Sequence, residues 1–144
     1  LRIALFALLA VQVLALMQSS RVASGLQNYV VDHRAEVTQL SRMVANADGP
    51  VLTDDYMGLL PERGKGIYFQ PFEMTQLARD GDWNQRPFLE DIARERFPLI
   101  MIWSPPFARE IKQDRWTPHM LEEINDHYER TGRVADMVIY RPRT

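Results

Sequence analysis

Residues 87–103 read PFLEDIARERFPLIMIW, a short helical pattern followed at once by an unbroken apolar run. In the first half, Leu89 and Ile92 recur at helical spacing, and Pro87 suits the first turn of a helix, where its missing N–H costs nothing. In the second half, residues 98–103 are apolar throughout and have the length of a strand. A strand without polar alternation is typical of a sheet that is covered on both faces. The stretch therefore predicts a helix that leads into the central strand of an α/β domain.

The sequence after this strand predicts one more helix and one more strand. Residues 104–116 begin with Ser-Pro-Pro and turn polar and mixed, which indicates a loop. Thr117 is placed to cap a helix whose first position is Pro118 and whose stop signal is Gly132. The apolar residues 137–140 then form the predicted final strand.

The sequence before residue 87 predicts helices and strands in alternation. Apolar side chains recur at helical steps over residues 29–47, which indicates a helix with one buried face. Residues 51–53 form a short predicted strand, and Asp54 is placed to cap a short helix after it. Residues 67–70 form a further predicted strand, and residues 71–80 a helix that starts with a proline.

This alternation decides the fold class that we expect. Helices and strands at such short spacings predict a small layered α/β domain with a mainly parallel sheet of about four strands. The chain has 144 residues, of which 46% are hydrophobic, enough for one packed domain. We expect three parts: an apolar transmembrane helix over residues 1–18, a small polar linker over residues 19–28, and the α/β domain over residues 29–144.

The first residues are unusually apolar. Residues 1–17, LRIALFALLAVQVLALM, have only Arg2 and Gln12 as charged or polar positions, so no polar stripe is left along a helix. Three interpretations stay open: the end of a membrane-spanning helix, a secretory signal with small residues at positions 22–24 for cleavage, or a buried helix of a soluble fold. We favour the membrane helix, because the chain begins at Leu1 rather than at Met.

Composition and motifs exclude several kinds of function within these 144 residues. The chain has no cysteine, which excludes disulfides, thiolate metal sites and cysteine nucleophiles. The net charge is −2 without a run of Lys or Arg, so we expect no nucleic-acid partner. Residues 63–66, Arg-Gly-Lys-Gly, lack the spacing and the hydroxyl residue of a phosphate-binding loop, and no GxSxG elbow occurs. We expect no cofactor and no bound metal ion.

Two adjacent carboxylates follow the first predicted strand. Asp54 and Asp55 come directly after residues 51–53, and ligands of open α/β sheets gather at the carboxyl ends of strands. The pair is therefore a candidate for holding a divalent cation or a sugar hydroxyl. The alternative is that Asp54 caps the next helix and Asp55 is a solvated acid in its first turn.

A second candidate group lies on the last predicted helix. His119, Glu123 and His127 recur every four residues, a spacing that can bring metal ligands to one face. Acidic neighbours on the same side of the helix favour an ordinary solvated face instead.

Aromatic side chains gather near the predicted strand ends, next to amides and carboxylates. These aromatic residues are Tyr68, Phe69, Phe72, Trp83 and Trp103. Rings to stack on, with amides and carboxylates to bind hydroxyls, are what a carbohydrate site uses. The same residues also suit an ordinary hydrophobic core, so both interpretations stay open.

Three motifs carry a resemblance to a known family. They are VLTDD at residues 51–55, GKGIYFQPFEMTQLARDGDW at residues 64–83, and PFLEDIARERFPLIMI at residues 87–102. Together with the residues between them, they resemble the soluble tail domain of bacterial multi-spanning glycosyltransferases. Those enzymes belong to the GT-C superfamily and include relatives of the protein mannosyltransferases and the lipid A aminoarabinose transferase.

The resemblance implies the C-terminal extracytoplasmic domain of an enzyme in the bacterial inner (plasma) membrane, which takes a sugar from a polyprenyl-phosphate donor. The catalytic carboxylate of that family lies in an earlier loop, so we expect no catalytic residue here and no activity from this chain alone. We expect the domain to cover the active site or to contact the acceptor. The expected partners are the membrane, the rest of the parent transmembrane chain, and a glycan or a lipid-linked sugar. The expected substrate-binding residues are Asp54, Lys65, Gln70, Phe72 and Glu73.

Two other classes of protein stay open. One is a secreted or membrane-anchored α/β binding module, with a cleaved signal or a single anchor. The other is a fragment of a soluble α/β enzyme. The parent reading frame distinguishes them, because many further apolar spans upstream of Leu1 favour the transferase and a start codon just before it favours the secreted module.

Overall fold

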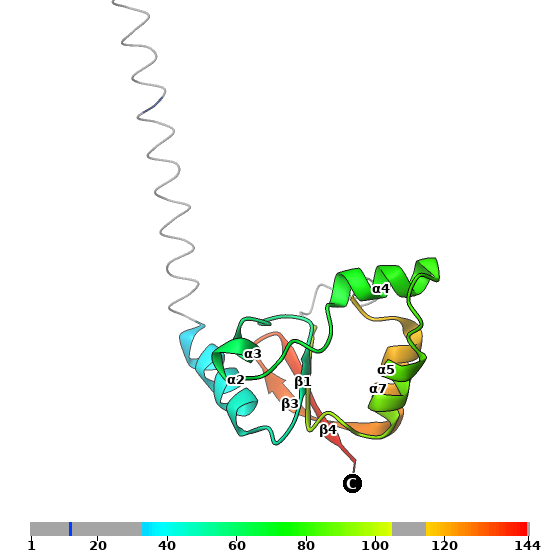
Figure 1. Cartoon of the computed structure of the whole chain (residues 1–144). Helices are drawn as coiled ribbons and strands as arrows, with labels where there is room; N and C mark the ends of the chain where they lie inside the picture. Colours follow the sequence, from blue (N-terminus) through cyan, green and yellow to red (C-terminus); the bar gives the residue numbers. More distant parts are fainter. Residues whose placement is uncertain (1–11, 13–32, 105–114, 144) are drawn as a thin grey trace, which may run out of the picture. The chain divides into compact units, whose positions relative to one another are not determined.

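The computed structural model describes Gln12, residues 33–104 and residues 115–143 of the chain (Figure 1). The chain divides into two compact units, Leu1–Ala35 and Glu36–Thr144, and the fold below is that of the second unit. The expected transmembrane helix and linker lie outside the described residues, apart from Gln12. Among the helices in the described ranges, none combines the length and the apolar composition needed to cross a bilayer.

The described residues of the second unit form helices and strands without strict alternation, because three helices lie between β1 and β2 and two strands follow α7; α2 starts just before this unit. The elements are α2 (Arg34–Asn46), β1 (Val51–Thr53), α3 (Leu59–Glu62), α4 (Pro71–Asp80), α5 (Arg86–Ala93), β2 (Leu99–Trp103), α7 (Pro118–His127), β3 (Tyr128–Val134) and β4 (Met137–Pro142). The predicted α/β class with a four-stranded sheet is therefore confirmed.

The sheet is mixed, and the predicted mainly parallel arrangement is wrong. Its strand order is β1-β2-β4-β3. β1 pairs with β2 in parallel, with Val51 opposite Leu99. β2 and β4 are antiparallel, with Ile102 opposite Val138, and β3 and β4 are antiparallel as well. One predicted strand does not join the sheet, and one strand of the sheet was not predicted. These two errors account for the difference between the predicted mainly parallel sheet and the mixed sheet.

The missed strand is β3, which was predicted as the end of a helix reaching Gly132. The helix ends at His127, and the backbone of Tyr128 is already extended, with φ −120° and ψ 147°. Tyr128 and Val134 are buried, while the residues between them are exposed. A polar edge strand of this kind lacks the alternation that identifies strands in a sequence. Gly132 follows a slip in the β3–β4 register, as at a β-bulge, and does not stop a helix.

The absent strand is the one predicted over residues 67–70, which form no ladder with the sheet. Side chains hold this segment instead. Phe69 is buried and stacks on Phe88, with ring centroids 4.9 Å apart. The aromatic run that predicted a strand therefore reflects side-chain packing on a helix.

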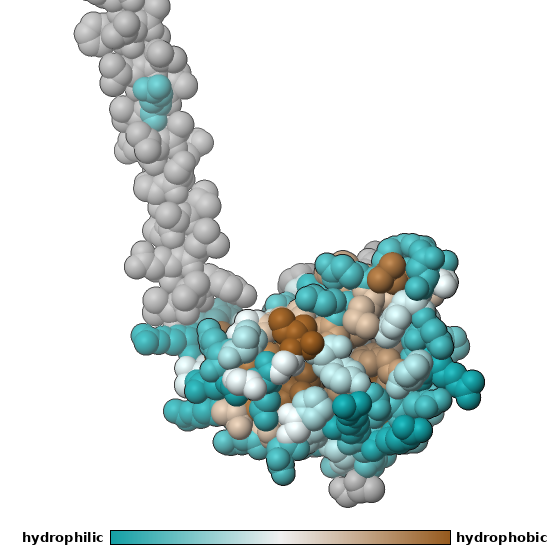
Figure 2. Space-filling model, viewed as in Figure 1, coloured by the Kyte–Doolittle hydropathy of each residue, from teal (hydrophilic) through white to brown (hydrophobic). Residues whose placement is uncertain are grey.

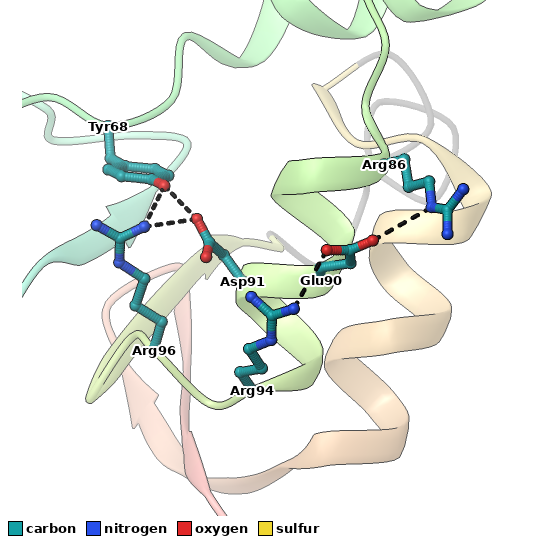
Figure 3. A network of polar contacts seen from close by, with 6 residues as sticks. All are labelled: Tyr68, Arg86, Glu90, Asp91, Arg94 and Arg96. Carbon is teal, nitrogen blue, oxygen red and sulfur yellow. Dashed lines mark hydrogen bonds and ion pairs between the residues drawn. The ribbon is translucent and has the colours of Figure 1, made fainter.

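A polar cluster fixes the same segment from the solvent side (Figure 3). The hydroxyl of Tyr68 donates to Oδ2 of Asp91 on α5, and Nη1 of Arg96 donates to the same oxygen at 2.7 Å. The bond to Asp91 raises the pKa of Tyr68 and lowers that of Asp91. Arg86, Glu90 and Arg94 form a separate exposed series of ion pairs along α5.

The core lies on both faces of β2, which explains its unbroken apolar sequence. Leu99 and Met101 pack into a cluster with residues of α2 and α3. Ile100 and Ile102 pack into a second cluster with residues of α5 and α7. Figure 1 shows these helix pairs on opposite sides of the strands. The prediction of residues 98–103 as a central buried strand is confirmed.

Several predicted helix ends are confirmed. Pro71 is the first residue of α4, and Gly81 ends that helix in the left-handed conformation, with φ 81°. The side chain of Thr117 accepts a hydrogen bond from the backbone N–H of Met120, and Pro118 begins α7. The first helix of the domain, predicted over residues 29–47, is described from Arg34 to Asn46.

Candidate functional site

Asp54 lies just beyond the carboxyl end of β1, and the residue is only 6% exposed. Its Oδ1 accepts a hydrogen bond of 2.6 Å from the backbone N–H of Trp103, the last residue of β2. Its Oδ2 accepts one of 2.8 Å from the indole Nε1 of Trp116, which lies just before α7. One carboxylate thus joins the ends of two parallel strands to the start of the last helix.

Burial dominates the electrostatics of this carboxylate. Loss of water raises the pKa of Asp54 from 3.8 to about 6, although the bonds from Trp103 and Trp116 and the charge of Arg115 act in the opposite direction. The neighbouring Asp55 carboxylate also acts to raise it, and a pKa of about 6 is the net result of all these contributions. A carboxyl group with a raised pKa at a strand end is a candidate for a functional role.

Arg115 lies beside Asp54 and contacts two aromatic rings. Its Nη1 donates a hydrogen bond of 2.6 Å to the backbone oxygen of Asp54 and lies 3.6 Å from Oδ2 of Asp55. Its guanidinium carbon lies 4.6 Å from the ring centroid of Trp103 and 5.4 Å from that of Phe72. The Nε atom of Arg115 is buried and has no hydrogen-bond partner among the described residues. The guanidinium is thus held by two rings and by the sheet edge.

The start of α4 brings an exposed ring to this edge. Phe72 is 55% exposed, although Arg115 lies against its ring. The helix is attached by Thr75, whose Oγ1 donates a hydrogen bond of 2.9 Å to the backbone oxygen of Arg115. Thr75 is fully buried, so this attachment is shielded from water.

Six residues therefore meet at one edge of the sheet, and we call them the Asp54 cluster. They are Asp54, Asp55, Phe72, Trp103, Arg115 and Trp116. The cluster combines a buried carboxyl group, a partly shielded cation and an exposed aromatic ring. Among the residues that the structure describes, no group of three His, Asp or Glu side chains converges as metal ligands would.

The helix-capping interpretation of Asp54 is wrong. α3 begins after Gly58, and no side chain caps it. Asp55 makes the local turn contact instead, since its Oδ1 accepts a hydrogen bond of 2.8 Å from the backbone N–H of Tyr56. Asp54 turns inward because the N–H groups of Trp103 and Trp116 offer its two oxygens partners that are fixed by the fold.

The five predicted substrate-binding residues fall into three groups. Asp54 and Phe72 are joined through Arg115. Gln70 and Glu73 flank Phe72 at the start of α4 and are exposed, and the side chain of Gln70 makes no capping bond. Lys65 lies against the end of α2, where its Nζ donates a hydrogen bond of 2.6 Å to the backbone oxygen of Ala47. That bond gives Lys65 a structural role.

Arg115 and Trp116 were not predicted as site residues, because residues 104–116 were predicted to form a loop. An arginine next to a tryptophan just before a capped helix is the sole local signal, and it does not identify a partner 61 or 62 residues away. Trp103 was noted as an aromatic at a strand end, but its backbone N–H, rather than its ring, contacts Asp54.

The histidines of α7 do not form a shared site with Glu123. His127 lies 3.4 Å from Glu123, whereas His119 lies 3.8 Å from Glu122. All four side chains are exposed by a third or more, as the solvated-face interpretation expected. An open hollow on α7, lined by Pro118, Leu121, Glu122, Asn125 and Asp126, does not include any residue of the Asp54 cluster.

The exposed hydrophobic side chains lie close together in sequence. Among the described residues, the large ones are Ile67, Phe72 and Leu77, and Figure 2 shows brown areas around the segment that joins α3 to α4 and over α4. Of the three, Phe72 belongs to the Asp54 cluster, which makes this cluster the best candidate for a contact surface. Comparisons of the chain with protein-family models, with curated proteins and with solved structures found no match.

Proposed function

We propose that this chain is the C-terminal extracytoplasmic domain of a bacterial membrane glycosyltransferase that uses a polyprenyl-phosphate-linked sugar. In this proposal, residues 1–18 are the last transmembrane helix, and the domain lies on the outer side of the plasma membrane. The domain is not catalytic by itself. It covers the active site or contacts the acceptor through Phe72 and the exposed residues beside it.

One observation carries the proposal: two motifs of the family resemblance meet at a single site. The motif at residues 51–55 supplies Asp54, and the motif at residues 64–83 supplies Phe72. Arg115 contacts both, with its Nη1 on the backbone oxygen of Asp54 and its guanidinium over the ring of Phe72. Two motifs whose only role is to build the hydrophobic core do not require an exposed aromatic side chain where they come into contact.

The side chains around Phe72 suit a neutral, hydroxyl-rich ligand. The exposed ring offers apolar surface on which the C–H face of a sugar can stack. Gln70 and Glu73 are exposed on either side of it and supply an amide and a carboxylate for hydroxyl groups. Because Arg115 is already close to Asp55, its positive charge is partly compensated, which disfavours a strongly anionic ligand.

The experiment is acceptor kinetics of the full-length parent enzyme in membranes. Phe72→Ala and the double variant Gln70→Ala, Glu73→Ala are compared with Leu77→Ala, an exposed residue of the same helix outside the Asp54 cluster. We expect kcat/KM for the acceptor to fall about tenfold in the first two variants, as the loss of one stacking or hydroxyl contact would give. Leu77→Ala should retain the activity of the unchanged enzyme.

If all three variants have the acceptor kinetics of the unchanged enzyme, with equal amounts of folded enzyme in the membrane, the acceptor role is contradicted. The parent reading frame tests the enzyme class separately. Several upstream apolar spans are expected, and a start codon immediately before Leu1 would instead support the secreted or membrane-anchored binding module.

A further inference from the structure

The Asp54 carboxylate connects four parts of the fold. It extends from the end of β1, contacts the last residue of β2 and the residue before Thr117, and lies beside Arg115, to which α4 is attached through Thr75. Arg115 donates its hydrogen bond to the backbone oxygen of Asp54, and its charge interacts with the carboxylate, so a change in the charge of the carboxylate acts on Arg115 and through it on the Phe72 ring. This route uses contacts between described residues alone.

Within residues 33–104 and 115–143, two charged side chains act on Asp54. Arg115, from the residues before α7, stabilises the ionised form, and Asp55, from the same turn as Asp54, destabilises it. The residues of β2 and α4 that take part in these contacts, Trp103 and Thr75, have no titratable side chain. Burial opposes the ionised form and two N–H donors support it, so the two forms of the carboxyl group are close in free energy.

We propose that Asp54 is a positioning residue whose protonation state sets the placement and the charge of the face formed by Phe72 and Arg115. The inference goes beyond the proposed function, because it holds whatever ligand this face binds. When ionised, the carboxylate accepts hydrogen bonds from Trp103 and Trp116 and attracts Arg115, which donates its own hydrogen bond to the backbone oxygen of Asp54.

Proton uptake changes this arrangement in two ways. A neutral carboxyl oxygen is a weaker acceptor than a carboxylate, so the bonds from Trp103 and Trp116 weaken. The proton also removes a negative charge beside Arg115, so the two carboxylates and the guanidinium together become neutral. Arg115 keeps its hydrogen bond to the backbone oxygen of Asp54, but of the two carboxylates only that of Asp55 still attracts its charge, so the guanidinium moves relative to the Phe72 ring.

The chain offers its own reporters for a test. It has three tryptophans, and two of them contact Asp54. Replacement of the third, Trp83→Phe, leaves fluorescence that arises from Trp103 and Trp116. We would follow this fluorescence in the full chain, in nanodiscs, between about pH 4.5 and 8, with far-UV circular dichroism as the measure of folding.

We expect a fluorescence transition with a midpoint near pH 6 that is absent in Asp54→Asn. Asp55→Asn should move the midpoint to lower pH, because an anion that opposes ionisation is lost. Arg115→Gln should move it to higher pH, because a cation that supports ionisation is lost. Variants of the histidines (His33, His119 and His127) to Gln should leave it in place, which excludes imidazole titration as its source.

Constant fluorescence over this range in folded protein would overturn the proposal. The same transition in Asp54→Asn would also overturn it. If Asp54→Asn does not fold, the midpoints of Asp55→Asn and Arg115→Gln are the test, and the proposal requires them to move in opposite directions. Midpoints that move in the same direction, or that do not move, would refute the proposal.

Discussion

The indole Nε1 of Trp116 donates a hydrogen bond of 2.8 Å to Oδ2 of Asp54, across 62 residues of sequence. Trp116 is fully buried and packs against Phe69 with its ring tilted by 31°, the ring centroids being 4.9 Å apart. The same side chain thus serves the hydrophobic core and the buried carboxylate. The stability of the core and the state of the Asp54 cluster are coupled through it.

The first prediction concerns this bond. Trp116→Phe leaves one oxygen of a buried carboxylate without its donor, and we expect a loss of about 1–3 kcal/mol in the free energy of unfolding at neutral pH. Urea denaturation measures it. At pH 4 the carboxyl group is protonated and the loss should be smaller, whereas a loss that does not depend on pH would indicate a cavity alone. Trp83→Phe serves as the control, because Trp83 is only partly buried.

The second prediction concerns stability and pH. The pKa of Asp54 is about 6 in the folded chain and ordinarily 3.8, so the folded state keeps this proton over a range in which the unfolded state has lost it. The stability that the proton contributes is present below about pH 4 and is lost as the pH rises through 6, by about 3 kcal/mol for this group. Denaturation curves at several pH values, compared with Asp54→Asn, isolate the contribution. A difference between the two proteins that stays constant with pH would contradict it.

The third prediction separates two phenylalanines that lie three residues apart. Phe69 is buried and Phe72 is 55% exposed. Phe69→Ala should cost about 3–5 kcal/mol of unfolding free energy, because this ring fixes the segment that precedes α4. Phe72→Ala should change it by less than about 1 kcal/mol. Similar losses in both would mean that Phe72 belongs to the core and would remove the basis for its proposed contact role.

The fourth prediction concerns the turn before β1. Gly49 has φ +140°, and a Cβ atom there would lie 3.2 Å from the ring of Pro98, directly before β2. Gly49→Ala should therefore destabilise the fold by about 1–3 kcal/mol. Gly66→Ala is the matched control, since a Cβ at Gly66 meets no atom within 4 Å. Thermal unfolding of both variants checks the difference, and equal midpoints would contradict this role of Gly49.

Local patterns predicted the parts of the fold that depend on neighbouring residues. β2 was predictable because an apolar run of strand length needs cover on both faces, and the start of α7 because Thr117 and Pro118 are typical of a helix start. β3 was not predictable, because its exposed side chains break the strand alternation. Residues 67–70 have the composition of a strand but pack on α5 through Phe69.

The candidate site was predictable only in part. Asp54 and Phe72 were identified because they lie near predicted strand ends, as a carboxylate and as one of several aromatics, and the structure brings them together through Arg115. Arg115 and Trp116 were not identified, because contacts over 61 and 62 residues leave no periodic pattern in the sequence. The expected role of Asp54 as a cap followed local spacing, whereas the donors from Trp103 and Trp116 arise from the tertiary fold.

The most direct measurement is the NMR chemical shift of the Asp54 side-chain carboxyl carbon, followed with pH in the full chain and assigned by its loss in Asp54→Asn. We expect this carbon to titrate with a midpoint near pH 6, and the indole N–H of Trp116 to shift with the same midpoint, because the two groups share a hydrogen bond. Titration near the ordinary value of 3.8, with a Trp116 N–H that does not follow it, would contradict a buried Asp54 carboxylate that organises this site.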